Sequence, residues 1–235
     1  MSRVPGISVS YQHSVNDPRM PTPGARGFGP AYWQTVYADP GHIDGVGNAT
    51  AHASYLKALF YLDMIPIRTV ADFGCGRGEL LAALVETFQP ERALAVEPSP
   101  WALDRLVPLT GEGTRVEVIA TDLARWCADD HREWTWFDLG VLNSVLQYLS
   151  DSEIQPVIAT LAHRVRYLYV SVPTDEDYAR MRRQTGFEDR WATARSKERY
   201  RALLSPHWRF VSSRLLESRR YADGEGSRFD GLFRF

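Results

Sequence analysis

The sequence predicts an α/β domain whose doubly wound, mostly parallel sheet has seven strands and ends in an antiparallel strand pair. From about residue 49, apolar runs of strand length alternate with stretches of helical periodicity, and glycine or polar residues follow the strands. Because each parallel crossover needs a helix to return the chain, this alternation favours helices on both faces of the sheet. With 235 residues, 44% of them hydrophobic, one domain over residues 31–235 is expected.

The first 30 residues differ from the rest, since they hold five prolines and four glycines without a hydrophobic stretch. This composition predicts an extended or mobile arm rather than a secretory signal. Elsewhere no apolar run approaches the roughly 20 residues of a membrane helix, so no membrane partner is expected. The two cysteines, Cys75 and Cys127, fit a reducing compartment, and a cytoplasmic protein is the expectation.

The elements follow one another in a regular order. Residues 49–65 have helical periodicity, and Pro90 predicts that the helix after the first strand ends near Gln89. Ser99 and Pro100 predict the start of the next helix, and Ser152 is the expected cap of a later one that contains Pro156. Strands are expected up to Phe73, over 93–96, up to Asp122, over 137–142 and up to Pro173, with a closing pair over 208–218 and 229–235.

A glycine cluster follows the first strand, where Gly74, Gly76 and Gly78 alternate after Asp72. Without side chains, these positions let a ligand lie against the backbone. A dinucleotide-binding loop would need its third glycine at position 79, where this chain has Glu79. A carboxylate at the positive end of the following helix would repel a pyrophosphate, so the loop predicts a ligand without phosphates.

Carboxylates end the next two strands. Glu97 follows Gly78 by 19 residues and is placed to accept hydrogen bonds from both hydroxyls of a ribose. Asp122 ends the third strand, where it is placed to accept from an exocyclic amine such as that of adenine. A nucleoside without phosphates that meets these groups describes S-adenosylmethionine.

The segments VADFGCGRG, AVEPSP, ATDL and LNSVLQYL resemble the successive motifs of class I S-adenosylmethionine-dependent methyltransferases. The resemblance covers about residues 68–173 and implies a Rossmann-like fold, S-adenosylmethionine as cofactor and S-adenosylhomocysteine as product. Many members have a Glu-His pair after the fourth strand, where this chain has Gln147 and Tyr148. The cofactor contacts that the resemblance implies are Asp72, Gly74, Gly76 and Gly78 for the loop and the methionine moiety, Glu97 for ribose, Asp122 and Leu123 for adenine, and Asn143 as a wall.

The reaction that this family carries out is an in-line displacement, so the protein mainly aligns the acceptor and excludes water. No histidine forms an i, i+4 pair with another histidine or a cysteine, and no metal is predicted. A net charge of −2 and the absence of an NPPY-like segment do not favour nucleic acid. The expected function is metal-independent methylation of an oxygen or nitrogen atom of a small molecule, as in secondary metabolism.

A second class of function stays open, because a fold and a cofactor loop do not establish turnover. The chain would then bind S-adenosylmethionine or S-adenosylhomocysteine without catalysis. A nicotinamide-dependent oxidoreductase is a third interpretation. The sequence does not predict an oligomeric state.

The acceptor is expected near residues 174–206, interpreted as a helical lid or substrate insertion in which basic residues outnumber acidic ones. Most of these charges predict a solvated helical face. A sharper hypothesis gives the lid an anion-accepting role and hence an anionic acceptor. The residues of that lid are Tyr178, Arg183, Trp191 and Arg195, and the candidates to face the reacting methyl group are His52, Tyr55 and Tyr148.

Overall fold

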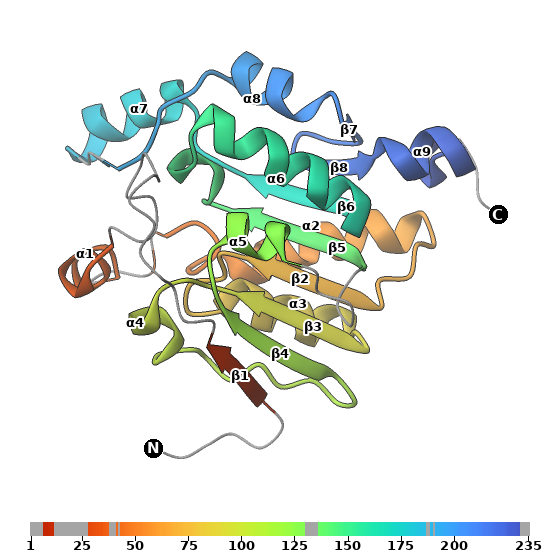
Figure 1. Cartoon of the computed structure of the whole chain (residues 1–235), viewed down its shortest axis with the longest axis horizontal. Coiled ribbons are helices and arrows are strands. Elements are labelled where there is room, and N and C mark those ends of the chain that lie inside the picture. Colours follow the sequence, from red (N-terminus) through yellow and green to blue (C-terminus); the bar gives the residue numbers. More distant parts are fainter. Residues whose placement is uncertain are drawn as a thin grey trace.

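The computed structural model describes residues 7–11, 28–37, 41, 43–129, 136–186, 189 and 191–230. Within them lies a sheet of eight strands in the order β1-β4-β3-β2-β5-β6-β8-β7 (Figure 1). Six strands run parallel, and β8 is antiparallel to both β6 and β7. The strands are β1 (Ile7–Tyr11), β2 (Thr69–Phe73), β3 (Arg92–Val96), β4 (Arg115–Ala120), β5 (Phe137–Asn143), β6 (Val165–Ser171), β7 (Trp208–Phe210) and β8 (Leu215–Ser218).

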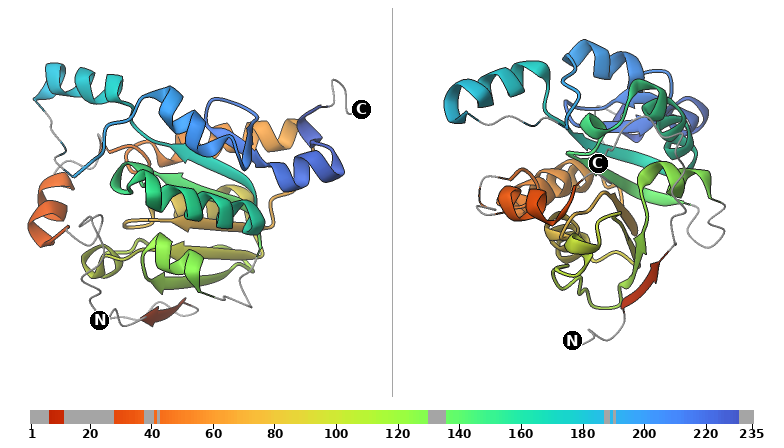
Figure 2. Two further views of the ribbon diagram at one scale, coloured as in Figure 1. Left: turned by 45° about the horizontal axis from the view of Figure 1, so that its top comes forward. Right: turned by 60° about the vertical axis from the view of Figure 1, so that its left-hand side comes forward.

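Helices cover both faces of the sheet, as the βα alternation predicts (Figure 2). On one face, Val70 of β2 packs with side chains of α2 (Ala49–Leu62) and α3 (Glu79–Phe88). On the other face, Phe73 of β2 packs with α5 (Leu123–Ala128), α6 (Asp151–Arg164) and α8 (Lys197–Leu204). Every residue of β2 is buried, and three of its five residues, Val70, Ala71 and Phe73, are apolar.

The remaining helical segments lie at the margins of these layers (Figures 1 and 2). They are α1 (Pro30–Val36), α4 (Pro100–Leu103), α7 (Asp175–Thr185) and α9 (Arg219–Glu225), with short 3-10 turns over Leu146–Tyr148 and Arg228–Asp230. The predicted ends hold for two helices. Gln89 is the C-cap of α3 before Pro90, and Ser99 caps α4 ahead of Pro100.

The predicted cap of α6 is wrong, because Ser150 rather than Ser152 takes that position. The Ser150 hydroxyl accepts from the Glu153 backbone N–H at 3.3 Å, and the Glu153 carboxylate accepts from the Ser150 N–H at 2.7 Å. This reciprocal capping box satisfies two backbone donors and extends the helix toward its N-terminus. Pro156 consequently lies inside the helix, beyond the first turn, where a proline is best tolerated.

The C-terminal strand pair is present, but its predicted position is wrong. Both strands, β7 and β8, lie within residues 208–218, where the Val211 N–H bonds the Leu215 carbonyl at 2.9 Å and closes a hairpin. The serines at 212 and 213 supply this turn. Most of the segment between the two predicted strands forms helix α9 (Arg219–Glu225) instead. Residues 231–235 of the second predicted strand lie outside the described residues.

The N-terminal arm contributes an eighth strand that the sequence analysis did not predict. Residues 7–11 pair in parallel with β4, with Val9 opposite Val118. The chain then winds outward from β2 through β3 to β4 and returns to β5 on the other side of β2. The strand order therefore reverses between β2 and β5, and in such sheets ligands bind beyond the carboxyl ends of the strands at this point.

The cap of α6 provides a test of these contacts. Replacing Ser150 with alanine removes one half of the capping box and is expected to lower the free energy of unfolding by about 1 kcal/mol. Ser152→Ala is the matched control and should change it by less than about 0.5 kcal/mol. Urea unfolding measures both values, and a larger loss for the control would contradict the assignment of the cap.

Candidate functional site

The glycine loop at the end of β2 has a backbone that only glycine adopts without strain. Gly74 and Gly78 have φ angles of 87° and 82°, and Gly76 has 58°. A Cβ atom on Gly74 would lie 2.6 Å from the Val145 side chain, so this position also requires a close approach. The Gly74 N–H bonds the Val96 carbonyl at 2.6 Å, which holds the loop against the end of β3.

Glu97 joins the same loop to β3 from the other side. One of its carboxylate oxygens accepts from the Gly76 N–H at 2.9 Å, and the other accepts from the Ser99 N–H at 2.8 Å. The side chain is buried, and burial raises the pKa of Glu97 to about 7 against the lowering effect of these two bonds. Burial, with the nearby charge of Glu97, raises the pKa of Asp72 to about 8.

A cavity lies beyond the carboxyl ends of β2 and β5. The glycine loop and Asn143 form one side, and an aromatic wall forms the other. The side-chain amide of Asn143 donates to the Asp44 carbonyl at 2.9 Å, whereas its buried Oδ1 atom has no partner among the described residues. Such an atom is suited to accept a hydrogen bond from a ligand. The aromatic wall consists of Phe28, Tyr32, Trp33, Tyr37 and Tyr148.

Asp44 also lines this cavity, and a network of hydrogen bonds fixes its carboxylate. Oδ1 accepts from His52 Nε2 at 2.9 Å and from the Asn48 amide at 3.0 Å, and Oδ2 accepts from the Ser171 hydroxyl at 2.7 Å. Burial alone would raise the pKa of Asp44, but these bonds outweigh it and hold that pKa well below its usual range. Since a carboxylate has about four acceptor positions, one remains for a ligand.

His52 is a positioning residue behind Asp44 and does not line the cavity. It is buried, and its Nδ1 atom lies 2.5 Å from the Tyr169 hydroxyl, which in turn accepts from Arg214 at 3.3 Å. Because a carboxylate only accepts, Nε2 of His52 is the donor to Asp44. In the series Arg214, Tyr169, His52 and Asp44, each group therefore donates to the next one toward the cavity.

The other residues predicted to contact the methyl group have different surroundings. The Tyr148 hydroxyl lies at the cavity, where it donates to Asp189 at 2.8 Å and lies 3.1 Å from the Tyr32 hydroxyl. Burial, with the neighbouring Tyr32 and Asp189, raises the pKa of Tyr148 far above its usual value, so it stays protonated. Tyr55 bonds Ser212 at 2.7 Å and lies outside this cavity.

A match to a family model described as a methyltransferase domain covers residues 70–167, from β2 to β6. This match supports the resemblance to class I S-adenosylmethionine-dependent methyltransferases over the part of the chain that holds the glycine loop. The chain is 26% identical over 139 residues to the mitomycin biosynthesis 6-O-methyltransferase of Streptomyces lavendulae, which covers 57% of this chain. The chain spans only 38% of the length of that relative.

Solved structures show the same fold. The small RNA methyltransferase HEN1 matches 75% of this chain and 26% of its own, with a TM-score of 0.57 and 16% identity. The plantazolicin methyltransferase BamL, in complex with a triazolic desmethylPZN analog and SAH, matches 74% of this chain and 64% of its own. Its TM-score is 0.53 and its identity 14%.

The residues present fit S-adenosylmethionine as a cofactor. Cβ atoms at Gly74 and Gly76 would collide with Val145 and with the Tyr37 hydroxyl, so the loop is a cradle that only bare backbone forms. The Asn143 Oδ1 atom lacks a partner at its rim. Glu97 keeps acceptor capacity for two further donors, which matches the two hydroxyls of a ribose.

The structure brings some of the predicted cofactor residues together and leaves others apart. Asp72, Gly74, Gly76 and Asn143 line the cavity. Glu97 adjoins it from behind the loop, and Gly78 is the N-cap of α3. Asp122 is the N-cap of α5, where it accepts from the Arg125 N–H at 2.9 Å, and Leu123 lies in the core. An adenine contact at the last two stays a prediction.

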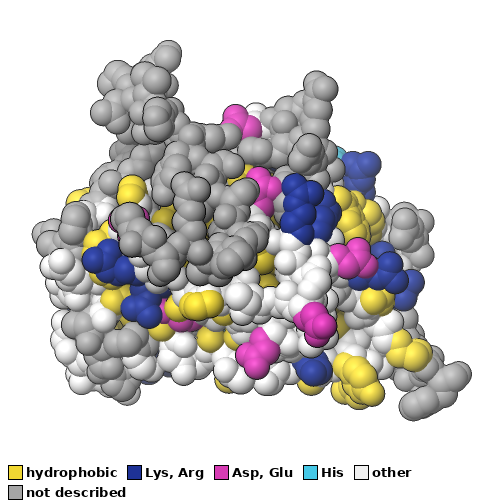
Figure 3. Space-filling view, turned by 90° about the horizontal axis from the view of Figure 1, so that it is seen from below, with side chains coloured by type: hydrophobic (Ala, Val, Ile, Leu, Met, Phe, Trp, Pro, Cys, Tyr) yellow, Lys and Arg dark blue, Asp and Glu magenta, His cyan; other side chains and the backbone are white. Residues whose placement is uncertain are grey.

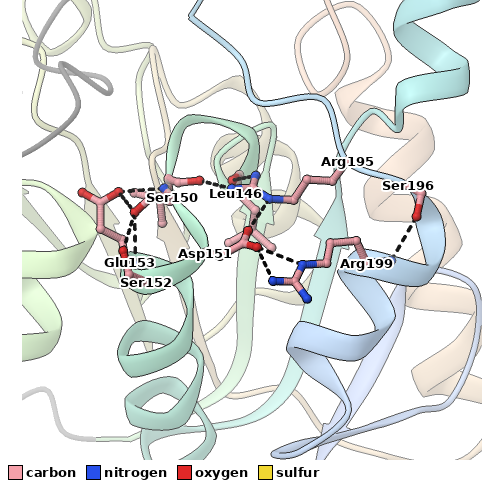
Figure 4. A network of polar contacts seen from close by, with 9 residues as sticks. Leu146, Ser150, Asp151, Ser152, Glu153, Arg195, Ser196 and Arg199 are labelled. Carbon is pink, nitrogen blue, oxygen red and sulfur yellow. Dashed lines mark hydrogen bonds and ion pairs between the residues drawn. The ribbon is translucent and has the colours of Figure 1, made fainter.

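The structure does not bring the predicted basic lid residues to the cavity. Arg195 is buried, donates to Asp151 at 2.7 Å and to the Leu146 carbonyl at 3.2 Å, and so joins residues 174–206 to α6 (Figure 4). Arg183 is exposed on α7, and Tyr178 is half-buried outside the cavity. Trp191 packs 6.4 Å from the ring of Phe28, at the edge of the aromatic wall.

Sequence reasoning missed Asp44 and Phe28. Asp44 lies in a turn before α2, and the Asp-Gly pair at 44–45 predicts a turn but no functional role. Phe28 precedes Gly29 and Pro30, in the segment interpreted as an arm. Phe28 stacks on Tyr32 and packs edge-on against Tyr148, which follows β5. The contact with Tyr148 spans 120 positions of the sequence and so leaves no local pattern.

Three further observations bear on the expected partners. None of the described helices is long and apolar enough to cross a bilayer. In the part of the chain that the structure describes, no three His, Cys, Asp or Glu side chains gather as metal ligands. On the face seen in Figure 3, basic and acidic side chains are interspersed. A cytoplasmic location stays a prediction.

The Asp44 network can be tested by Asp44→Asn. Loss of the carboxylate is expected to lower the free energy of unfolding at pH 7 by about 1–2 kcal/mol. This is less than for a fully buried carboxylate, because 39% of the Asp44 side chain is exposed and solvent weakens its interactions. A lowered pKa stabilises the fold above the unfolded value, so the difference should shrink as pH falls below about 4. Urea unfolding at several pH values measures this, with exposed Asp104→Asn as control; equal losses at pH 7 would refute the network.

Proposed function

We propose that this protein transfers the methyl group of S-adenosylmethionine to an oxygen or nitrogen atom of a small molecule. The observation that supports this most is the cavity at the point where strand order reverses, with the glycine loop on one side and an aromatic wall on the other. The similarity to the mitomycin biosynthesis 6-O-methyltransferase supports an acceptor from secondary metabolism.

The proposed roles of the residues follow from their positions. The bare backbone of the loop and Asp72 hold the methionine moiety, and the Glu97 carboxylate accepts from the ribose hydroxyls. The bound cofactor supplies a methyl group on a sulfonium, which needs an in-line nucleophile and a site from which water is excluded. The apolar rings of the aromatic wall exclude water from the cavity. Four of the five rings come from residues 28–37, on and next to α1.

Asp44 and Tyr148 would act on the acceptor in complementary ways. Asp44 has one acceptor position left and is held ionised, so it accepts a hydrogen bond from a hydroxyl or amino N–H of the methyl acceptor. This bond would orient the lone pair of the acceptor atom toward the methyl group. Tyr148 stays protonated and serves to hold the wall in place through Asp189. No Lys or Arg lines this cavity among the described residues.

Incubation with methyl-labelled S-adenosylmethionine and fractionated metabolites tests the proposal. Label in a small-molecule fraction, with release of S-adenosylhomocysteine, is expected, and Gly74→Val should abolish both because its side chain fills the cradle. Tight cofactor binding without transfer to any fraction would instead favour the non-catalytic binding protein. RNA in place of metabolites serves as a separate arm, and label only there would refute a small-molecule acceptor.

Cofactor affinity should depend on pH through Glu97. The ribose hydroxyls donate hydrogen bonds, and an ionised carboxylate accepts them better than a protonated one. Burial raises the pKa of Glu97 to about 7. Affinity for S-adenosylhomocysteine is therefore expected to rise as pH increases through about 7. A one-proton linkage gives at most about tenfold per pH unit below the pKa. Calorimetry from pH 6 to 8.5 measures the slope.

Glu97→Gln should weaken binding at pH 8 by about tenfold and flatten most of that slope, leaving the part due to Asp72. Glu86→Gln, an exposed change on α3, is the matched control and should keep both affinity and slope. An unchanged slope in the Glu97 variant would show that the carboxylate does not meet the ribose.

A further inference from the structure

A second cavity of about 200 Å³ lies at the carboxyl end of β6, against β8 and α8. It is separate from the cofactor cavity, because the two share no lining residue. Its floor is apolar and includes Leu204, Phe210 and Leu216. Its rim carries the charged groups Lys197, Arg201 and Arg214.

The charge of this rim is one-sided, since no carboxylate lines the cavity among the described residues. Lys197 and Arg201 lie four residues apart on α8, and such like-charged pairs destabilise a helix. Neither forms a salt bridge within the described residues, although the nearby Glu198 carboxylate, which does not line the cavity, attracts both. Arg201 lies over the Phe210 ring at 4.8 Å. Three cations around one hollow that no carboxylate lines suit an anionic ligand.

Neighbouring arginines of the same segment show the contrast. Arg195 and Arg199 both bond Asp151, at 2.7 and 2.8 Å, and so fasten α8 to the start of α6 (Figure 4). These two charges are accounted for by the fold. Lys197 and Arg201 alternate with them along the chain and line the second cavity instead. The segment therefore holds two arginines bonded to Asp151 and two cations that line the second cavity.

The second cavity adjoins the cofactor cavity through two hydrogen-bonded connections. Ser171 lines the second cavity and donates to Asp44, which lines the first, at 2.7 Å. Arg214 bonds Tyr169, whose hydroxyl contacts His52 behind the same Asp44. Side chains at the end of β6 thus connect the cationic rim of the second cavity to the Asp44 carboxylate of the first.

We propose that the second cavity is the subsite for an anionic group of the methyl acceptor. The group is a phosphate, sulfate or carboxylate joined to an apolar part, with Lys197, Arg201 and Arg214 on the anion and the floor on the apolar part. This inference rests on the proposed methyl transfer. It places the anion-binding role that the sequence suggested for Arg183 and Arg195 on other residues of the same region.

Calorimetry with phenyl phosphate tests the subsite on the full chain saturated with S-adenosylhomocysteine. Phenyl phosphate should bind, while phenol and inorganic phosphate should bind at least about tenfold more weakly, because each lacks one half of the recognised group. Lys197→Gln/Arg201→Gln should weaken phenyl phosphate by at least about tenfold and leave S-adenosylhomocysteine affinity unchanged. Lys57→Gln/Arg180→Gln removes the same charge elsewhere and should bind phenyl phosphate like the wild type.

Three results would overturn the inference. Equal loss in both double variants would mean that only net charge matters, and phenol binding as tightly as phenyl phosphate would mean that the anion is not recognised. Inorganic phosphate binding as tightly as phenyl phosphate would assign the cavity to a free anion instead of an acceptor. Failure of the proposed function is distinguishable, because it would abolish label transfer while leaving phenyl phosphate binding intact.

Discussion

The site depends on one buried carboxylate. Glu97 stands at the end of β3 and accepts one backbone hydrogen bond from the glycine loop and one from the start of α4. Burying a charge is unfavourable, as the raised pKa of this group indicates, and the two N–H donors offset only part of that cost. The loop is therefore held in a conformation that leaves a carboxylate ready to accept further donors, which is the requirement of a diol ligand.

Around this anchor, the aromatic wall unites segments that are distant in the sequence. Trp33 of α1 stacks on Trp101 of α4 at 5.7 Å, and Phe28 packs against Tyr148 at 4.8 Å. Each contact adds to the burial of a large apolar surface. The segment around α1 and the segment after β5 thus close over one cavity, and the ends of β2 and β5 between them supply its floor.

Much of the fold could be predicted from the sequence, because buried parallel strands and amphipathic helices leave clear periodicities. The loop glycines and Glu97 could also be located at the ends of β2 and β3, because a glycine cluster and a carboxylate directly follow apolar strand-length runs. Asp44, by contrast, acts through partners 127 residues away, such as Ser171, which no local pattern shows. The basic residues of 174–206 look alike in sequence, and only Asp151 decides which of them are structural.

The first strand moves the open edge of the sheet outward. β1 pairs with Val116 to Ala120 of β4 and takes its place as the outermost strand on that side. The edge of an outermost strand presents unpaired backbone groups on which another strand can pair. A chain without its first dozen residues would keep every described residue that lines the two cavities, and β4 would present that edge instead.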